Sequence, residues 1–133
     1  MSRELRVPIR TDGDILAARQ GGRTLGSELG LGDVDLTLLA TAISEVARNI
    51  LAYAGQGEIL LGTVEHDGRR GIVVIARDQG PGIPDIALAL QDGYSTSGSL
   101  GLGLPGARRL MDEFVIVSSA CEGTTVRMTK WGR

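Results

Sequence analysis

A carboxylate and two glycines follow an apolar run near the middle of the chain, in the segment Asp78-Gln-Gly-Pro-Gly-Ile83. The preceding segment, Gly71-Ile-Val-Val-Ile-Ala-Arg77, predicts a buried strand that ends at the acid. Glycines after a strand let a small molecule approach the backbone closely, because no side chain intervenes. A strand that simply leaves the sheet through a turn has the same pattern, so this motif alone leaves both interpretations open.

A second acid precedes an amide by four residues, as Glu45 and Asn49. Residues four apart stack on one side of a helix, and a helical-wheel count places this pair at the border of the apolar face. A carboxylate can accept a proton, and an amide oxygen is a hard ligand for Mg²⁺. The pair suits a general base beside a metal, although an exposed pair on a solvated flank has the same spacing.

Small residues dominate the segment 93–106, in which Gly101-Leu-Gly103 directly precedes a predicted helix. Backbone amides at a helix N-terminus suit a phosphate group. The spacing lacks the Gly-Lys-Ser/Thr end of a P-loop, and a flexible connector would also explain the composition. Further on, Gly123-Thr-Thr125 could supply a hydroxyl to a polar pocket, or could be ordinary strand sequence.

Periodicity predicts the elements that position these groups. Alternation predicts a strand over residues 5–10, with Pro8 indicating a sheet edge. Apolar residues at three-four spacing predict two helices, the first opened by Thr11-Asp-Gly-Asp14 and the second running from Asp33 to about Tyr53. The remaining predicted elements are strands over 58–65 and 71–78 joined by an Asp-Gly hairpin turn, a helix over 104–112, and strands over 113–119 and 123–130.

This order predicts one α+β domain over residues 1–133. Because two of the strand pairs are hairpins, we expect a mixed sheet that is mostly antiparallel. The helices should cover one face of this sheet, which gives a two-layer α/β sandwich.

Composition excludes several classes of function. The net charge is −2 and aromatic residues are 3% of the chain, so neither a phosphate footprint nor a base-stacking platform for nucleic acid is expected. No apolar stretch approaches the roughly 20 residues that span a bilayer, so no membrane association is expected. With Cys121 as the single cysteine, an internal disulfide is impossible and a cytoplasmic location is expected. We expect Cys121 to be a packing residue and His66 to be a surface residue.

Taken together, the ordered motifs resemble the four nucleotide boxes of the GHKL ATPase and kinase superfamily, which has the Bergerat ATP-binding fold. Three segments look specifically like the RsbT-type serine/threonine kinases of the bacterial stressosome. They are Ala42-Ile-Ser-Glu-Val-Ala-Arg-Asn-Ile50, Gly93-Tyr-Ser-Thr-Ser97 and Gly103-Leu-Pro-Gly-Ala-Arg-Arg-Leu-Met-Asp-Glu-Phe114.

The resemblance implies a role for each motif. Asp78 would bind the adenine amino group of ATP or ADP, and Thr124 would support that contact. Asn49 would coordinate Mg²⁺, and Glu45 would be the catalytic base. The other nucleotide-binding residues it implies are Gly80, Gly82 and Ile83 around the adenine, and Gly101, Leu102, Gly103 and Leu104 around the phosphates.

The predicted lid over residues 91–103 has no basic side chain, because no Lys or Arg occurs between Asp78 and Ala107. The negative charge of the phosphates would then be neutralised by Mg²⁺, by backbone dipoles or by an arginine outside this segment. Arg48 is a candidate, but helical geometry turns it away from Asn49, so we expect it to contact solvent or a partner.

The resemblance further implies an ATP-dependent kinase that phosphorylates a STAS-domain scaffold protein and activates a serine phosphatase once released. Two alternatives remain. One is an anti-sigma-factor kinase that binds a sigma factor, and the other is a nucleotide-dependent interaction module without turnover, against which the presence of Glu45 argues.

Overall fold

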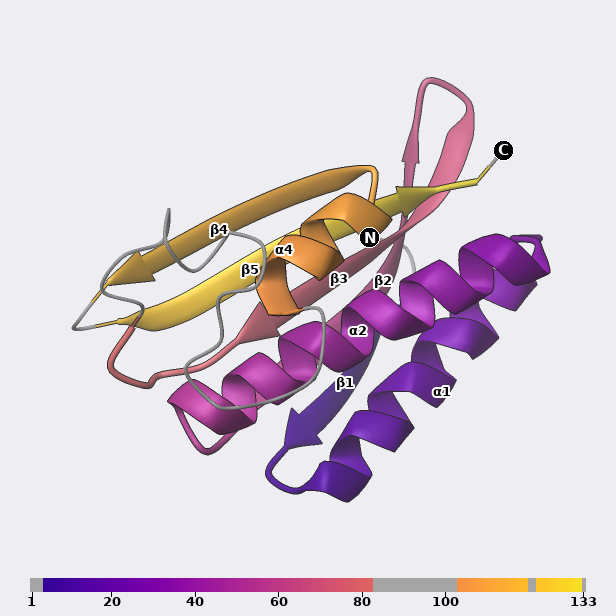
Figure 1. Cartoon of the computed structure of the whole chain (residues 1–133). Helices are drawn as coiled ribbons and strands as arrows, with labels where there is room; N and C mark the ends of the chain where they lie inside the picture. Colours follow the sequence, from indigo (N-terminus) through magenta and orange to yellow (C-terminus); the bar gives the residue numbers. More distant parts are fainter. Residues whose placement is uncertain (1–3, 83–102, 120–121, 133) are drawn as a thin grey trace.

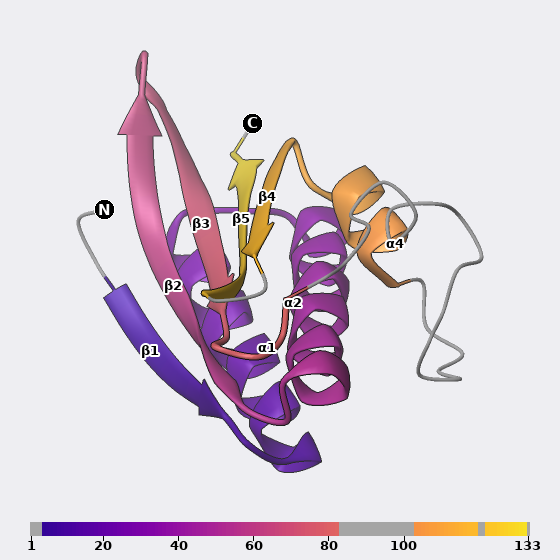
Figure 2. The ribbon, with the colours of Figure 1, turned by 90° about the vertical axis from the view of Figure 1, so that its left-hand side faces the viewer.

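The computed structural model describes residues 4–82, 103–119 and 122–132. In chain order, the elements are β1 (Glu4–Ile9), α1 (Asp12–Glu28), α2 (Asp33–Tyr53), β2 (Gly57–His66), β3 (Arg69–Arg77), α4 (Gly103–Leu110), β4 (Glu113–Ser119) and β5 (Gly123–Trp131). The helices lie on one side of a five-stranded sheet (Figure 1), and a quarter turn shows the two layers (Figure 2). The predicted α+β sandwich is confirmed.

The strand order is β1-β2-β3-β5-β4, and every described pairing is antiparallel. β1 is an edge strand, as Pro8 predicted, because proline cannot donate to a second neighbour. The predicted hairpin turn is confirmed at Asp67 and Gly68, whose φ angles are 52° and 77°. His66 lies beside this turn with 75% of its side chain exposed, in agreement with its predicted surface position.

Helix α4 is shorter than predicted, ending at Leu110 rather than Asp112. The reason lies in Asp112, which already belongs to the sheet connection. Its backbone N–H donates to the carbonyl of Thr129 at 3.0 Å, and its carboxylate accepts a hydrogen bond from the N–H of Trp131 at 2.7 Å. The helix must therefore stop before this residue.

The core lies between the sheet and the apolar faces of α1 and α2. The predicted face of α2 is confirmed, since Leu39, Ile43, Val46 and Ile50 are all at most 2% exposed. Gly22 of α1 lets the two helices approach, because a Cβ atom there would lie 2.4 Å from Cδ1 of Ile43. None of the described helices combines the length and hydropathy of a bilayer-spanning segment.

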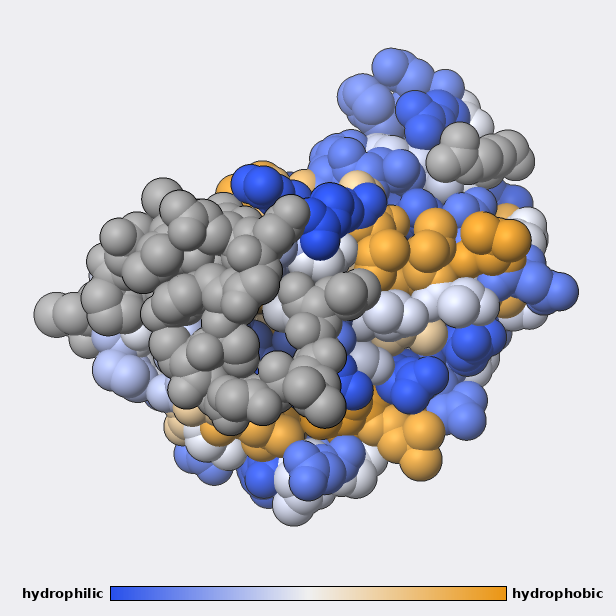
Figure 3. Space-filling view, in the orientation of Figure 1, coloured by the Kyte–Doolittle hydropathy of each residue, from blue (hydrophilic) through white to orange (hydrophobic). Residues whose placement is uncertain are grey.

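The helix side of the surface is mixed in hydropathy (Figure 3). Apolar groups gather over the first turns of α2, where Val34 is 73% exposed, among polar and charged groups.

A buried cation holds α4 against the rest of the fold. Lys130 is 4% exposed, and its Nζ donates to the carbonyl of Leu110 at 2.9 Å and lies 3.8 Å from Oδ1 of Asp35. A cation at the last carbonyls of a helix is favourable, because it compensates the negative end of the helix dipole. Lys130 therefore fixes the C-terminus of α4 beside the start of α2.

Candidate active site

Asp78 directly follows Arg77, the last residue of β3, close to the strand end that the sequence predicted. Its side chain is buried, at 7% exposure. Its Oδ1 accepts hydrogen bonds from the backbone N–H of Gly80 at 2.9 Å and of Thr124 at 3.3 Å. Its own N–H donates to the carbonyl of Thr124 at 3.0 Å. The hydrogen bonds that Asp78 accepts from described residues both go to Oδ1, so Oδ2 can accept a hydrogen bond from a ligand.

Thr124 lies beside Asp78, as predicted, and is 3% exposed. Its hydroxyl is 2.7 Å from the hydroxyl of Ser118 on β4. Sequence reasoning missed Ser118. The signal was present, because Phe114, Ile116 and Ser118 alternate on the less exposed face of β4, which places a hydroxyl where the pattern calls for an apolar residue.

The loop after Asp78 fits tightly against its neighbours. A Cβ atom on Gly80 would lie 2.5 Å from Cβ of Ala54 at the end of α2. Gly82 has φ +80°, and a Cβ there would lie 2.4 Å from the carbonyl oxygen of Ser119. Both predicted glycines are thus required by the fold itself, and they hold the loop close to Asp78. Ile83 lies outside the described residues.

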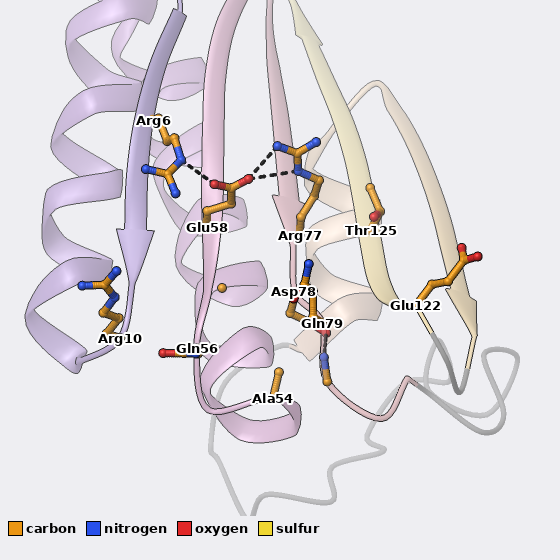
Figure 4. Close-up of a pocket in the computed structure, with 12 residues that line it drawn as sticks. Arg6, Arg10, Ala54, Gln56, Glu58, Arg77, Asp78, Gln79, Glu122 and Thr125 are labelled. Carbon is orange, nitrogen blue, oxygen red and sulfur yellow. Dashed lines mark hydrogen bonds and ion pairs between the residues drawn. The ribbon is translucent and has the colours of Figure 1, made fainter.

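A cavity of about 630 Å³ opens beside Asp78 and Gly80 (Figure 4). Of the candidate site residues, Asp78 and Gly80 line it, whereas Glu45, Asn49, Gly103 and Thr124 do not. One wall is charged, and it was not predicted: Glu58 on β2 accepts hydrogen bonds from Arg6 and from Nη2 of Arg77, the latter at 2.6 Å. The hydrogen bond from Arg6, followed by that from Arg77, holds the pKa of Glu58 below its ordinary value.

Glu45 on α2 is more buried than predicted, with 6% exposure, because α4 packs over its side of the helix. Its Oε2 accepts a hydrogen bond from the backbone N–H of Gly103 at 2.7 Å. Its Oε1 accepts one from Nη1 of Arg48 at 2.8 Å. Arg48 contacts solvent, as predicted, with 46% of its side chain exposed. Its ion pair with Glu45 was not predicted, although positions three apart on a helix are neighbours. Asn49 is half-buried one turn beyond Glu45.

The structure joins α2 to the segment predicted to bind phosphate. Gly103 opens α4 with φ +67°, and its amide faces Glu45. Leu104 is 3% exposed and packs in the core, so only its backbone could face a nucleotide. Gly101 and Leu102 lie outside the described residues, as does Cys121.

The donor set fits Mg²⁺ only as an ion shared with a ligand. Among the described residues, no group of three His, Cys, Asp or Glu side chains could hold a metal by itself. Asn49 would supply one hard oxygen ligand, and Mg²⁺ commonly completes its shell with waters and substrate phosphates. This is the arrangement expected for a metal that enters with a nucleotide.

Residues 10–130 match the family model of the histidine kinase-like ATPase domain. The chain is 56% identical over 127 residues to the serine/threonine-protein kinase RsbT of Bacillus subtilis (strain 168), covering 96% of each chain. It is 32% identical over 103 residues to an anti-sigma F factor of Bacillus licheniformis, covering 72% of this chain and 69% of that protein.

Two solved structures share the fold at low sequence identity. One contains the RsbU and RsbW domains of Rv1364c from Mycobacterium tuberculosis, with a TM-score of 0.65 and 21% identity, covering 99% of this chain and 33% of that one. The other is the mycobacterial sensor histidine kinase MprB, with a TM-score of 0.55 and 20% identity, covering 97% of this chain and 99% of that one.

Proposed function

This chain belongs to the histidine kinase-like ATPase domain family, and from that premise we infer that it is an ATP-dependent serine/threonine protein kinase of the RsbT type. The observation that carries this inference is 56% identity across 96% of both chains to a serine/threonine-protein kinase. The anti-sigma relatives are more distant, at 32% identity over 72% of this chain.

In the proposed site, Asp78 selects the purine. Its Oδ2 accepts a hydrogen bond from the adenine amino group, while the amides of Gly80 and Thr124 hold Oδ1. The two backbone donors fix the orientation of the carboxylate, which supports a preference for a ligand with an exocyclic amino group.

Phosphate binding is assigned to the start of α4 and to Asn49. The amide of Gly103, together with those of Gly101 and Leu102, would face the phosphates, and Asn49 would hold Mg²⁺ through its amide oxygen. The ion, when bound, neutralises charge that develops on the transferred phosphoryl group. Asn49 and the amides of α4 orient that group toward the acceptor.

Glu45 is proposed as the base. The acceptor hydroxyl oxygen forms a bond to the γ-phosphorus as the bond from that phosphorus to the bridging oxygen breaks. ADP leaves with the electron pair, and the hydroxyl proton moves to the Glu45 carboxylate. His66 is an exposed hairpin residue, so the acceptor is proposed to lie on another protein.

We propose a STAS-domain scaffold protein as the acceptor, a serine phosphatase as a second partner, and the cytoplasm as the location. Incubation with radiolabelled ATP, Mg²⁺ and candidate STAS-domain proteins tests the acceptor. The expected result is label on a serine or threonine of the STAS protein. Label on the kinase alone, or stable capture of a sigma factor, would contradict it.

The matched variants are Glu45→Ala and, as a control, Glu65→Ala at an exposed position of β2. Glu45→Ala should abolish transfer while calorimetry finds the ATP dissociation constant within about threefold of wild type, because a general base contributes roughly 10²–10⁴-fold to rate and little to binding. Persistent transfer in Glu45→Ala would remove Glu45 as the base.

A further inference from the structure

Two groups with separate proposed tasks are bonded to each other in this structure. The amide of Gly103, proposed as a phosphate donor, donates to Oε2 of Glu45, the proposed base, at 2.7 Å. A backbone amide carries one hydrogen. When the Gly103 N–H donates to a phosphate instead, Oε2 of Glu45 loses this hydrogen bond and becomes available to accept a proton.

Loss of this hydrogen bond leaves the charged Glu45 carboxylate in a buried position. Glu45 is only 6% exposed, and a buried carboxylate that loses its partners pays a large desolvation cost. It would also gain rotational freedom about its side chain. A second hydrogen-bond donor must therefore fix the Glu45 carboxylate while the Gly103 amide binds phosphate.

Arg48 meets this need. Its Nη1 lies 2.8 Å from Oε1, the oxygen that Gly103 does not use. Among the described residues no other cation pairs with Glu45, and the segment between Asp78 and Ala107 contains no Lys or Arg that could replace it. The Arg48 side chain is 46% exposed, so one side faces solvent while the other holds the acid.

Resting on the proposed function, we propose that Arg48 is a positioning residue for the kinase reaction. Its guanidinium fixes the Glu45 carboxylate, so that Oε2 holds the start of α4 before nucleotide binds. The same contact keeps Oε2 in place as proton acceptor once phosphate has drawn the Gly103 amide away. An ordinary pair on a helix surface joins two residues of one helix, whereas this pair also holds the acid that bonds to α4.

Three variants test this role. Arg48→Met keeps the aliphatic stem and removes the charge, and Arg48→Lys keeps the charge with a less directional donor. Arg70→Met is the control, since Arg70 is exposed on the β2–β3 hairpin, away from α2 and α4.

The kinetic readout is the division between kcat and nucleotide affinity. Arg48→Met should lower kcat for transfer to the STAS protein by roughly tenfold or more, because misplacement of a catalytic group is costly. The ATP dissociation constant should stay within about twofold of wild type, and Arg48→Lys should recover most of the rate. An unchanged kcat, or a loss confined to ATP affinity, overturns the proposal.

The second readout needs neither nucleotide nor acceptor. Hydrogen exchange of the Gly103 amide, followed by NMR in the free protein, should be several-fold faster in Arg48→Met than in wild type or Arg70→Met. Amides in the middle of α2 should be unchanged, which a general loss of stability would not produce. Unchanged exchange at Gly103 overturns the proposal. If Glu45→Gln still transfers phosphate, the proposed base fails instead, whatever the exchange result.

Discussion

A side-chain carbon on Gly123 would lie 2.2 Å from the carbonyl oxygen of Asp78. Gly123 begins β5 with φ +83°, and the backbone of the Asp78 loop crosses directly over it. The close approach lets the amide of Thr124, the next residue, reach the Asp78 carboxylate. The shape of the proposed adenine site therefore depends on a glycine in another strand.

Gly123→Ala should destabilise the protein by about 3 kcal/mol or more, since it combines a left-handed backbone angle with a backbone clash. Gly68→Ala is the control, because Gly68 has φ +77° but nothing lies within 4 Å of its Cβ position. That control should cost only about 1–2 kcal/mol. Urea unfolding measures both, and equal losses would show that the contact with Asp78 does not matter.

Asp78→Asn should weaken ATP binding by at least tenfold, because an amide of similar shape lacks the charge and presents donors toward the adenine amino group. The fold should survive, since the Asn oxygen can still accept from Gly80 and Thr124. Calorimetry with ATP and Mg²⁺ measures the affinity. Asp67→Asn, on the exposed hairpin turn, should bind as wild type. Unchanged binding in Asp78→Asn would remove this residue from the purine site.

Asn49→Ala should remove the dependence of ATP affinity on Mg²⁺. In wild type, titration with ATP should be tighter with Mg²⁺ than with a chelator, because Asn49 would hold an ion that neutralises phosphate charge. In the variant the two titrations should agree within about threefold. A variant that keeps the full Mg²⁺ effect would show that other groups hold the ion.

Glu58→Gln tests the charged wall of the cavity through pH. Since the hydrogen bonds from Arg6 and then Arg77 lower the pKa of Glu58, the carboxylate stabilises the fold above its unfolded pKa, near the ordinary value of 4.5. This contribution is lost as pH falls through the lower folded value. Near pH 7 the variant should be less stable by roughly 0.5–1 kcal/mol. The difference should shrink below about pH 4.5.

Urea unfolding between pH 3 and pH 7 measures this difference. The control is Glu65→Gln, in which an exposed carboxylate is replaced. A gap between wild type and Glu58→Gln that stays constant down to pH 3 would contradict the assignment of the pKa shift.

Periodicity and turn chemistry were enough to predict the fold, because each depends on neighbours along the chain. The apolar spacing of α2 placed Leu39, Ile43 and Val46 in the core, and Pro8 placed β1 at the edge. The carboxylate after an apolar run, followed by glycines, placed Asp78 at a strand end beside a loop. These are local signals, and the structure agrees with them.

Contacts between distant elements could not be read in the same way. Glu45 and Gly103 are 58 residues apart and meet only because α4 docks on α2, which also buries Glu45 beyond its predicted border position. The partner of Arg48 depends on a side-chain rotamer, and the burial of Lys130 depends on where α4 ends. Spacing along a helix or strand decides which face a residue occupies, whereas the packing of one element against another decides which partner it finds there.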